Sequence, residues 1–577
     1  MKIEKVVVIG SGTMGSGIAA HLCNANVPVT LLDLKTEISE KARERIYKSR
    51  PPLLTDKTKI DNIKVGNIND NFDVVKDADW VVEAVVERID IKHNIYEKIF
   101  KNRKKGAIVS SNTSSIPIKV LSEKLSQEEK KDFCITHFFN PVRYMGLLEI
   151  VKNENNDLNK INSEVNRLFD DQIKFTQELT RFPSLRGQEH TAQDFLFDEL
   201  TKRDYAVDRW TVNVDDIKDH PGFSPVKVDY SNAINVVATH RPRSETGKSL
   251  ILNGHIDVVP EGPYEMWSRN PFDPLVEGDW MYGRGSADMK AGIVANIFAL
   301  DALKSLGYQP AARVHVQSVV EEECTGNGAL ACLVRGYNAD AAIIPEPVDD
   351  KLVRGNMGVL WFKVKVKGLP VHVRDAGSGQ NAIEACFPLM KALRELEENW
   401  NSQKSAFKYY DKTEHPVNFN VGKIKGGDWA SSVPSWCEFD CRISIFPDWD
   451  PKEKSMEIEN CIREASRKHS YLSNNPPEIE WNGFFAKGYV LEEGSEAEKV
   501  LGEAHFVAYE GEMKSFISPA YLDARVFMVY GDCPCLVYGP YSQNIHGFDE
   551  RVSLSSVKRI TKAIALFIAD WCKLEKI

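Results

Sequence analysis

The stretch VVVIGSGTMGSGIAAHL, residues 6–22, places an apolar strand directly before a glycine-rich turn and an apolar helix. Gly10 permits the tight turn, Gly12 lets the backbone approach a pyrophosphate, and Gly15 lets the helix pack on the strand. Free N–H groups and the dipole at the start of the helix favour phosphate. Asp33 ends the next strand, where its carboxylate accepts the ribose hydroxyls and disfavours a 2′-phosphate. The stretch predicts a domain that binds NAD in preference to NADP.

Further short apolar runs alternate with helical stretches through about residue 150, which is typical of a parallel, doubly wound sheet. The runs are VTLLD (29–33), WVVEAVVE (80–87), AIVSSN (107–112) and CITHFFNP (134–141). The polar stretch KNENNDLNK that follows Val151 is the best linker candidate. We therefore expect an α/β chain whose residues 1–153 form an N-terminal Rossmann-like domain.

A second α/β pattern begins after this linker. Its strands are SLILNGH (249–255), ARVHVQSVV (312–320), DAAIIPE (340–346) and CLVYGP (535–540). Between the last two, apolar residues alternate with Lys363, Lys365 and Lys367, a period of two that predicts a sheet with one solvated face. We expect an α/β domain over 158–357 and 476–577, interrupted by an inserted α+β domain over 358–475.

Composition excludes several classes of protein. The 577 residues carry a net charge of −10, and no Lys/Arg tract is long enough to follow a nucleic acid backbone. No apolar stretch reaches the roughly 20 residues of a membrane span, and the N-terminus enters a strand without the pattern of a signal peptide. The 11 cysteines are scattered, which fits reduced thiols. We expect a cytoplasmic protein with neither nucleic acid nor membrane as partner.

Two histidines and three carboxylates fall near the predicted sheet edge where open α/β sheets place their sites. They are His255, Asp288, Glu323, Glu346 and His546. A mixed nitrogen and oxygen set suits Zn²⁺, or Mn²⁺ or Co²⁺, and does not suit thiophilic copper. The pattern predicts a divalent-metal site.

The first half resembles the NAD-binding domain of 3-hydroxyacyl-CoA dehydrogenases through VVVIGSGTMGSGIAAHL, VVEAVVERIDIK, SSNTSS and THFFNPVRYMGLLEIV. The resemblance implies that His137 is a general base oriented by Glu149. It also implies that cofactor or substrate contacts come from Glu87, Lys92, Ser114 and Asn140. The helical domain that follows in that family, and that closes over acyl-CoA, has no counterpart after Val151. NAD is therefore the expected ligand, with acyl-CoA as a further candidate.

The second half, about 158–577, resembles the acetylornithine deacetylase, succinyl-diaminopimelate desuccinylase and aminoacylase family of metallohydrolases. The resemblance implies a zinc-peptidase-like catalytic domain over 158–357 and 476–577 and a lid and dimerisation domain over 358–475. The motifs are NGHIDVVP, GRGSADMKAGI, VEEECTGNGA, PEP at 345–347 and YGPYSQNIHGFDE. The resemblance implies two metal ions: His255, Asp288 and Glu346 bind one, and Asp288, Glu323 and His546 bind the other. It further implies that Asp257 fixes the His255 imidazole and that Glu322 is the general base. Glu321 stands where the family usually has Asp, a change that we expect to be harmless.

The segment GLPVHVRDAGSGQNAIEA (368–385) resembles the lid of that family, which implies a homodimer through the lid. By resemblance, His372 stabilises the oxyanion from the partner subunit and Arg442 grips a substrate carboxylate; a structural salt bridge is the alternative for Arg442. Ser432 replaces the Asn that many relatives have before Val-Pro. The GGDW and HVRDAG stretches look most like the acetylornithine deacetylase branch, which also contains formyl-aminopyrimidine deformylases.

Three functions are compatible with these patterns. The favoured one is a dinuclear zinc amidohydrolase that removes an acyl group from a small N-acyl amino acid or related amine. In this interpretation the NAD-binding domain is an appendage of the hydrolase. The second is an NAD-dependent 3-hydroxyacyl-CoA dehydrogenase. In the third, neither half turns over and the NAD domain acts as a sensor or scaffold. A formyl-aminopyrimidine deformylase is an alternative within the first.

Overall fold

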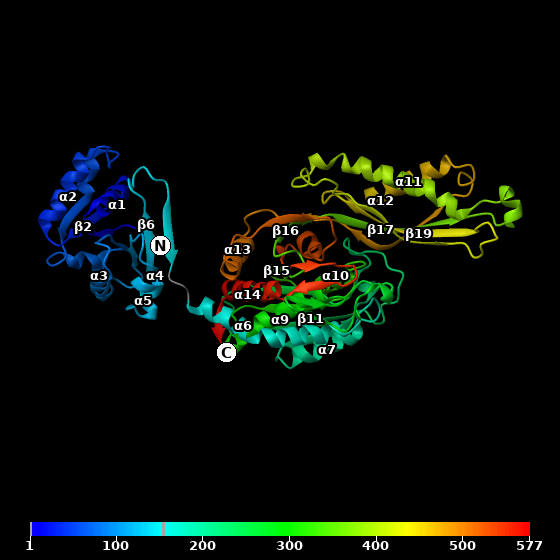
Figure 1. Ribbon diagram of the computed structural model, residues 1–577, viewed down its shortest axis with the longest axis horizontal. Helices are drawn as coiled ribbons and strands as arrows, with labels where there is room; N and C mark the ends of the chain where they lie inside the picture. The colour runs from blue at the N-terminus through cyan, green and yellow to red at the C-terminus, as the bar shows by residue number, and fades with distance from the viewer. Residues whose placement is uncertain (1–2, 153–155) are drawn as a thin grey trace. The chain divides into compact units, whose positions relative to one another are not determined.

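The computed structural model describes residues 3–152 and 156–577, so the linker expected after Val151 lies partly outside the described residues. The chain divides into two compact units, Met1–Asn159 and Lys160–Ile577. Figure 1 colours the first unit from blue to cyan. No helix in the described ranges is long and apolar enough to cross a membrane.

The first unit contains a seven-stranded sheet in the order β3-β2-β1-β4-β5-β6-β7. Its strands are β1 (Val6–Ile9), β2 (Val29–Asp33), β3 (Ile63–Asn67), β4 (Trp80–Glu83), β5 (Ile108–Ser111), β6 (Phe133–Phe138) and β7 (Leu148–Lys152). Its helices are α1 (Thr13–Asn24), α2 (Thr36–Lys48), α3 (Ile89–Asn102), α4 (Ile118–Leu121) and α5 (Gln127–Lys131). Neighbouring strands are parallel except β7, which is antiparallel to β6.

The alternation of side chains along β1 explains why helices cover both faces of this sheet. Val6 and Val8 belong to one buried cluster with Ile18 of α1, whereas Val7 and Ile9 belong to another with residues of α3. Strand β1 lies between β2 and β4, where the strand order reverses. The carboxyl end of β1 is the place where such folds bind dinucleotides, and the expected Rossmann-like architecture is confirmed.

The second unit is built on a six-stranded sheet in the order β23-β15-β10-β14-β9-β8. Its strands are β8 (Ala206–Thr211), β9 (Ile234–His240), β10 (Leu250–His255), β14 (Val314–Val319), β15 (Ala341–Ile344) and β23 (Cys535–Val537). Helices of this region are α6 (Asn156–Thr180), α7 (His190–Thr201), α8 (Val214–Ile217), α9 (Ala291–Ser305), α10 (Asn327–Val334), α13 (Glu496–Tyr509) and α14 (Leu554–Trp571). Strands β23, β15, β10 and β14 run parallel, so their carboxyl ends share one edge.

Short strands complete this body. They are β11 (Leu275–Glu277), β12 (Trp280–Tyr282), β13 (Tyr308–Pro310), β16 (Leu352–Asn356), β21 (Tyr489–Val490), β22 (Ser515–Ser518), β24 (Ser542–Gln543), β25 (Arg551–Ser553) and β26 (Leu574–Lys576). Strands β11, β12, β25 and β24 form a small sheet that joins the turn before α9 to the C-terminal region.

The segment expected to form the lid contains an antiparallel sheet in the order β18-β19-β17-β20, drawn in yellow-green to brown in Figure 1. Its elements are β17 (Gly358–Lys367), β18 (Phe419–Gly426), β19 (Trp436–Ile445), β20 (Glu478–Ala486), α11 (Ala382–Asn401) and α12 (Pro451–Arg467). The apolar side chains of β17 are buried in one cluster with those of both helices. The insertion extends to Ala486 and does not end at residue 475 as expected, because β20 completes the sheet beside β17.

Candidate functional site

Parallel strands bring three of the predicted metal-binding positions to one edge of the second unit's sheet. His255 is the last residue of β10, Glu323 follows β14, and Glu346 follows β15. Asp288 comes from the turn Ser286–Lys290 before α9, and His546 lies in the loop between β24 and β25. The five side chains therefore come from five separate segments that only the fold brings together.

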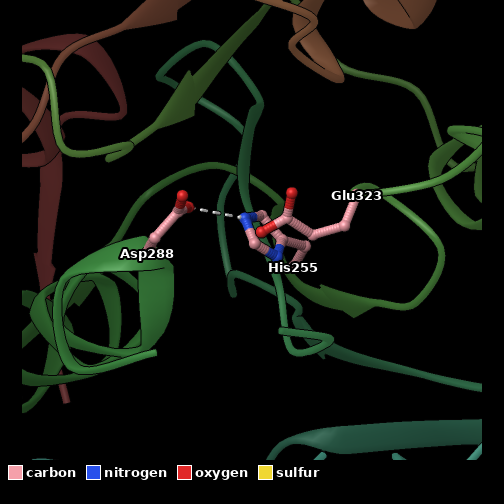
Figure 2. Close-up of side chains that lie close together, drawn as sticks. All are labelled: His255, Asp288 and Glu323. Atoms are coloured by element: carbon pink, nitrogen blue, oxygen red, sulfur yellow. Dashed lines mark hydrogen bonds and ion pairs between the residues drawn. The ribbon is translucent and has the colours of Figure 1, made fainter. Parts of the chain in front are cut away.

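Asp288 lies between two histidines, His255 and His546, and its contact with His255 is drawn in Figure 2. Its Oδ1 lies 3.1 Å from His255 Nε2, and its Oδ2 lies 3.3 Å from His546 Nε2. His546 Nε2 also lies 3.2 Å from the Glu323 carboxylate. Ligand atoms of His255, Asp288 and Glu323 all lie within 4.8 Å of one another. One carboxylate that faces two imidazoles with separate oxygens has the position of a bridging ligand.

Glu346 completes the set from the other side of His255. Its Oε1 lies 3.7 Å from His255 Nε2 and has no hydrogen-bond partner in the part of the chain that the structure describes. Burial, reinforced by the carboxylates of Asp288 and Glu323, raises the pKa of Glu346 to about 7. A buried acid with a free oxygen, beside two imidazoles and two further carboxylates, fits a divalent cation such as Zn²⁺, Mn²⁺ or Co²⁺.

Asp257 supports this cluster from behind. It is 2% exposed, and its two carboxylate oxygens accept the backbone N–H groups of Glu322 at 3.3 Å and Glu323 at 3.0 Å. His255 Nδ1 lies 2.9 Å from the Asp257 carbonyl oxygen and 3.6 Å from its carboxylate. Asp257 thus holds the His255 imidazole together with the loop that supplies both glutamates.

Glu322 is buried beside the cluster without belonging to it. Its Oε2 lies 3.9 Å from His255 Nε2, and burial raises the pKa of its carboxyl group well above the ordinary value. A carboxylate of raised proton affinity next to a metal cluster is suited to accept and return a proton.

Sequence reasoning did not assign a role to Glu550, which shapes the turn that carries Asp288. One oxygen of Glu550 accepts the backbone N–H groups of Ala287 at 3.0 Å and Asp288 at 3.1 Å. The other accepts Arg284 Nη1 at 2.6 Å, and both side chains are buried. The available signal was its position at the end of the quoted motif IHGFDE, directly after the segment that carries His546.

The two lid residues are not brought to the metal cluster. His372 is exposed, its Nδ1 accepts the Arg374 N–H at 3.0 Å, and no hydrogen bond within the described ranges joins it to the cluster. Arg442 donates to Ser444 Oγ at 3.1 Å and to the Pro519 carbonyl oxygen at 2.9 Å. Among the residues described, no carboxylate forms an ion pair with Arg442, and burial lowers the pKa of Arg442 to about 10.

The first unit has a separate cavity of about 380 Å³ at the carboxyl ends of its strands. It is lined by Met14, Ala84, Val85, Glu87, Asn112, Ser114, His137, Phe138, Phe139 and Asn140. His137 Nδ1 lies 2.8 Å from Glu149 Oε2 because the register of β6 and β7 pairs the two residues. Lys92 is 1% exposed and does not line the cavity; its Nζ lies 2.8 Å from Glu83 and 3.2 Å from Glu87.

The glycine-rich loop has the geometry that its sequence predicts. Gly10 has φ +101°, and a Cβ on Gly15 would lie 1.8 Å from the Gly10 carbonyl oxygen. A Cβ on Gly12 would meet no atom within 4 Å, so open space lies beside that backbone. Asp33 Oδ2 accepts the Ser11 N–H at 2.7 Å and the Ser11 hydroxyl at 2.6 Å, and so ties the loop to the end of β2.

Two family models match the chain. Residues 5–173 match the NAD-binding domain of 3-hydroxyacyl-CoA dehydrogenase, and residues 251–570 match peptidase family M20/M25/M40. The chain is therefore a fusion of an NAD-binding domain with a metallohydrolase. These families imply NAD and a divalent metal as ligands.

Curated relatives divide in the same way. An N-formyl-4-amino-5-aminomethyl-2-methylpyrimidine deformylase of Halalkalibacterium halodurans is 30% identical over 60% of this chain and 85% of its own length. A succinyl-diaminopimelate desuccinylase of Polynucleobacter necessarius is 24% identical over 54% of this chain and 79% of its own length. A "Probable 3-hydroxyacyl-CoA dehydrogenase" of Deinococcus radiodurans is 43% identical over 27% of this chain, which spans 47% of that relative.

Solved structures share the fold of the second part of the chain. Human carnosine dipeptidase 1 matches 72% of this chain and its own whole length with a TM-score of 0.58 at 14% identity. An M20 family metallo-carboxypeptidase from Sulfolobus solfataricus matches 70% of this chain and 99% of its own with a TM-score of 0.55 at 18% identity.

Proposed function

The chain belongs to peptidase family M20/M25/M40, and from that premise we propose that it hydrolyses the amide bond of a small N-acyl amine with Glu322 as general base. The observation that carries the proposal is the convergence of two histidines and three carboxylates beside a buried glutamate that is not one of them. This arrangement provides separate residues for binding metal and for moving a proton.

We propose that His255, Asp288 and Glu346 hold one cation, that Asp288, Glu323 and His546 hold a second, and that Asp288 bridges them. Two Zn²⁺ ions, or Co²⁺ or Mn²⁺, would supply Lewis acidity, which activates water and polarises a carbonyl group. Glu322 takes the proton of the attacking water and returns it to the leaving amine. Asp257 keeps the carboxylate of Glu322 in place through the backbone of residues 322 and 323.

Two substrate classes compete for this site. The preferred class is an N-acyl amino acid, as for an acetylornithine deacetylase, because Arg442 is a partly buried guanidinium with no ion-paired carboxylate among the described residues. Such a group is suited to bind a substrate carboxylate. The second class is an N-formyl aminopyrimidine, and its support is the deformylase that is 30% identical to this chain.

The lid supports a homodimer in this proposal. His372 is exposed and has no hydrogen bond to the candidate metal ligands within the described ranges, and we infer that it stabilises the oxyanion in the site of a partner subunit. The exposed Trp429 and Val373 near it are apolar surface that a second lid would cover.

A second activity is proposed for the first unit because His137 lines a cavity and is paired with Glu149. NAD bound there would accept a hydride. His137 would take the alcohol proton of a 3-hydroxyacyl substrate, with Glu149 fixing its tautomer. Reduction of acetoacetyl-CoA by NADH, compared between the parent protein and His137→Gln, tests this activity.

The decisive experiment measures metal content and amide hydrolysis on N-acetylornithine, an N-formyl aminomethylpyrimidine and N-succinyl-diaminopimelate, before and after chelation. The adjacent glutamates are a matched pair. Glu322→Gln should keep the metal and lose at least about 100-fold in kcat, because it removes only the proton carrier. Glu323→Gln should lose metal, because it removes a ligand. Unchanged turnover in Glu322→Gln would refute the mechanism.

A further inference from the structure

Three consecutive glutamates, residues 321–323, follow β14, and the first of them makes different contacts from the other two. Glu322 and Glu323 have their backbone N–H groups on Asp257, whereas the side chain of Glu321 points to Arg186. We propose that Glu321, held by Arg186 and Tyr230, is a positioning residue that fixes Glu322 as general base. This inference rests on the proposed hydrolase function and names a residue to which that function gives no role.

Glu321 is buried, with 2% of its surface exposed, and both oxygens of its carboxylate accept hydrogen bonds. Arg186 grips it with both prongs of the guanidinium, Nε at 2.5 Å and Nη2 at 2.6 Å. The Tyr230 hydroxyl donates to Oε2 at 2.6 Å, and the Thr325 hydroxyl donates to the same oxygen at 2.9 Å. A forked ion pair with two further donors fixes the orientation of a carboxylate more firmly than any single hydrogen bond.

The backbone of Glu321 shows what this grip achieves. Its φ is +68°, a left-handed conformation that is strained for an L-residue and persists only where the surroundings impose it. The Glu321 carbonyl oxygen accepts the N–H groups of Thr325 at 2.9 Å and Gly326 at 2.7 Å. The turn begins at the residue before Glu322, so the bonds that hold Glu321 set the direction in which the base leaves the strand.

The segment that carries Arg186 is attached through Ser184 to the strand end that carries Asp257. The Ser184 hydroxyl donates to the Ile256 carbonyl oxygen at 2.6 Å, and the Val258 N–H donates to the Ser184 carbonyl oxygen at 3.1 Å. The loop of Glu322 is therefore held from two sides, by the end of β10 and by the segment that Ser184 joins to it. Asp257 holds its backbone amides, and Arg186 holds the side chain of the residue before it.

A salt bridge that only stabilises the fold is the competing explanation, and the chain offers a matched control for it. Arg203 Nε lies 3.1 and 3.0 Å from the two oxygens of Asp301, and both side chains are largely buried. Asp301 lies near the far end of α9, about 15 Å along the helix from Ala291. Asp301→Asn therefore breaks a similar ion pair away from the metal cluster.

The test compares Glu321→Gln, Glu321→Asp and Asp301→Asn in the full chain loaded with Zn²⁺ or Co²⁺. Glu321→Gln should lower kcat about 10–100-fold while KM changes less than twofold. Its metal content and the visible spectrum of its Co²⁺ form should match the parent protein, because every ligand remains in place. Glu321→Asp keeps the charge and should recover part of kcat. Asp301→Asn should lower Tm and leave kcat unchanged.

Tyr230→Phe is the milder variant and decides the question if Glu321→Gln does not fold. It removes one bond to Glu321 and should lower kcat about 3–10-fold with unchanged metal content. Parent-like kcat in a folded Glu321→Gln, or activity lost only in proportion to lost metal, would overturn the positioning role alone. A parent protein that binds metal yet hydrolyses none of the N-acyl substrates would overturn the proposed function and this inference together.

Discussion

Glu550→Gln should loosen the turn that carries Asp288 without touching a metal ligand. The carboxylate of Glu550 is buried and neutralises Arg284, whose remaining bond is to the Gly547 carbonyl oxygen at 3.1 Å. An amide at this position must either direct N–H donors at the Arg284 guanidinium or release the N–H groups of Ala287 and Asp288. Removing one partner of a buried ion pair costs about 3–5 kcal/mol, which for a unit as long as Lys160–Ile577 corresponds to a fall in Tm of roughly 3–6 °C.

Metal affinity should fall as well, because the N–H groups that orient Asp288 lose a charged acceptor. Losses at such supporting positions are typically about 10–100-fold. Thermal unfolding of the chelated protein measures the first effect, and competition of Zn²⁺ with a chromophoric chelator measures the second. Asp279→Asn is the control, since the side chain of the exposed Asp279 accepts hydrogen bonds from Ser553 and Ser555 and makes none to the turn that carries Asp288 within the described ranges. A Glu550→Gln protein with the Tm and Zn²⁺ affinity of the parent would refute this reasoning.

Two further predictions concern other parts of the chain. Gly15→Ala should abolish NAD binding and destabilise the first unit, because a Cβ at this position would lie 1.8 Å from the Gly10 carbonyl oxygen. Gly12→Ala should leave the Tm of the first unit unchanged and weaken NAD binding, because a Cβ there would meet no atom within 4 Å. Thermal shift with and without NAD checks both, and parent-like NAD binding by Gly15→Ala would contradict the loop geometry. Burial lowers the pKa of His315 from 6.5 to about 4, so on acidification the unfolded state binds a proton at a higher pH than the folded state does. The contribution of neutral His315 to the free energy of unfolding of the second unit should therefore be fully present above pH 6.5. It should fall by about 3 kcal/mol as the pH drops to 4. Urea unfolding at pH 7 and pH 4.5 should show a smaller difference for His315→Gln than for the parent, and equal differences would show that His315 does not titrate in this way.

Much of the metal cluster could be predicted because its residues sit at the ends of strands. His255 ends and Glu346 follows a short, buried and largely apolar strand, and the carboxyl ends of parallel strands meet at one edge. Local sequence alone thus indicates both the strands and the edge at which their final side chains gather.

The supporting contacts could not be predicted because they join segments far apart in the chain. Glu550 accepts the Asp288 N–H across 262 positions, and Arg186 reaches Glu321 across 135. The end of the lid was missed for a similar reason. Strand β20 is identified as a lid strand only by its pairing with β17, and nothing in its own composition distinguishes it from the strands of the catalytic sheet.

The lid also enters and leaves the catalytic body through neighbouring strands. Val359, at the start of β17, pairs with Ala486, at the end of β20. A chain that omitted everything between these two residues would have its cut ends side by side, and a tight turn of a few residues could rejoin them. The insertion can therefore be deleted or replaced by a different domain at this one position of the chain. Neither change alters the order or the connections of the strands in the six-stranded sheet.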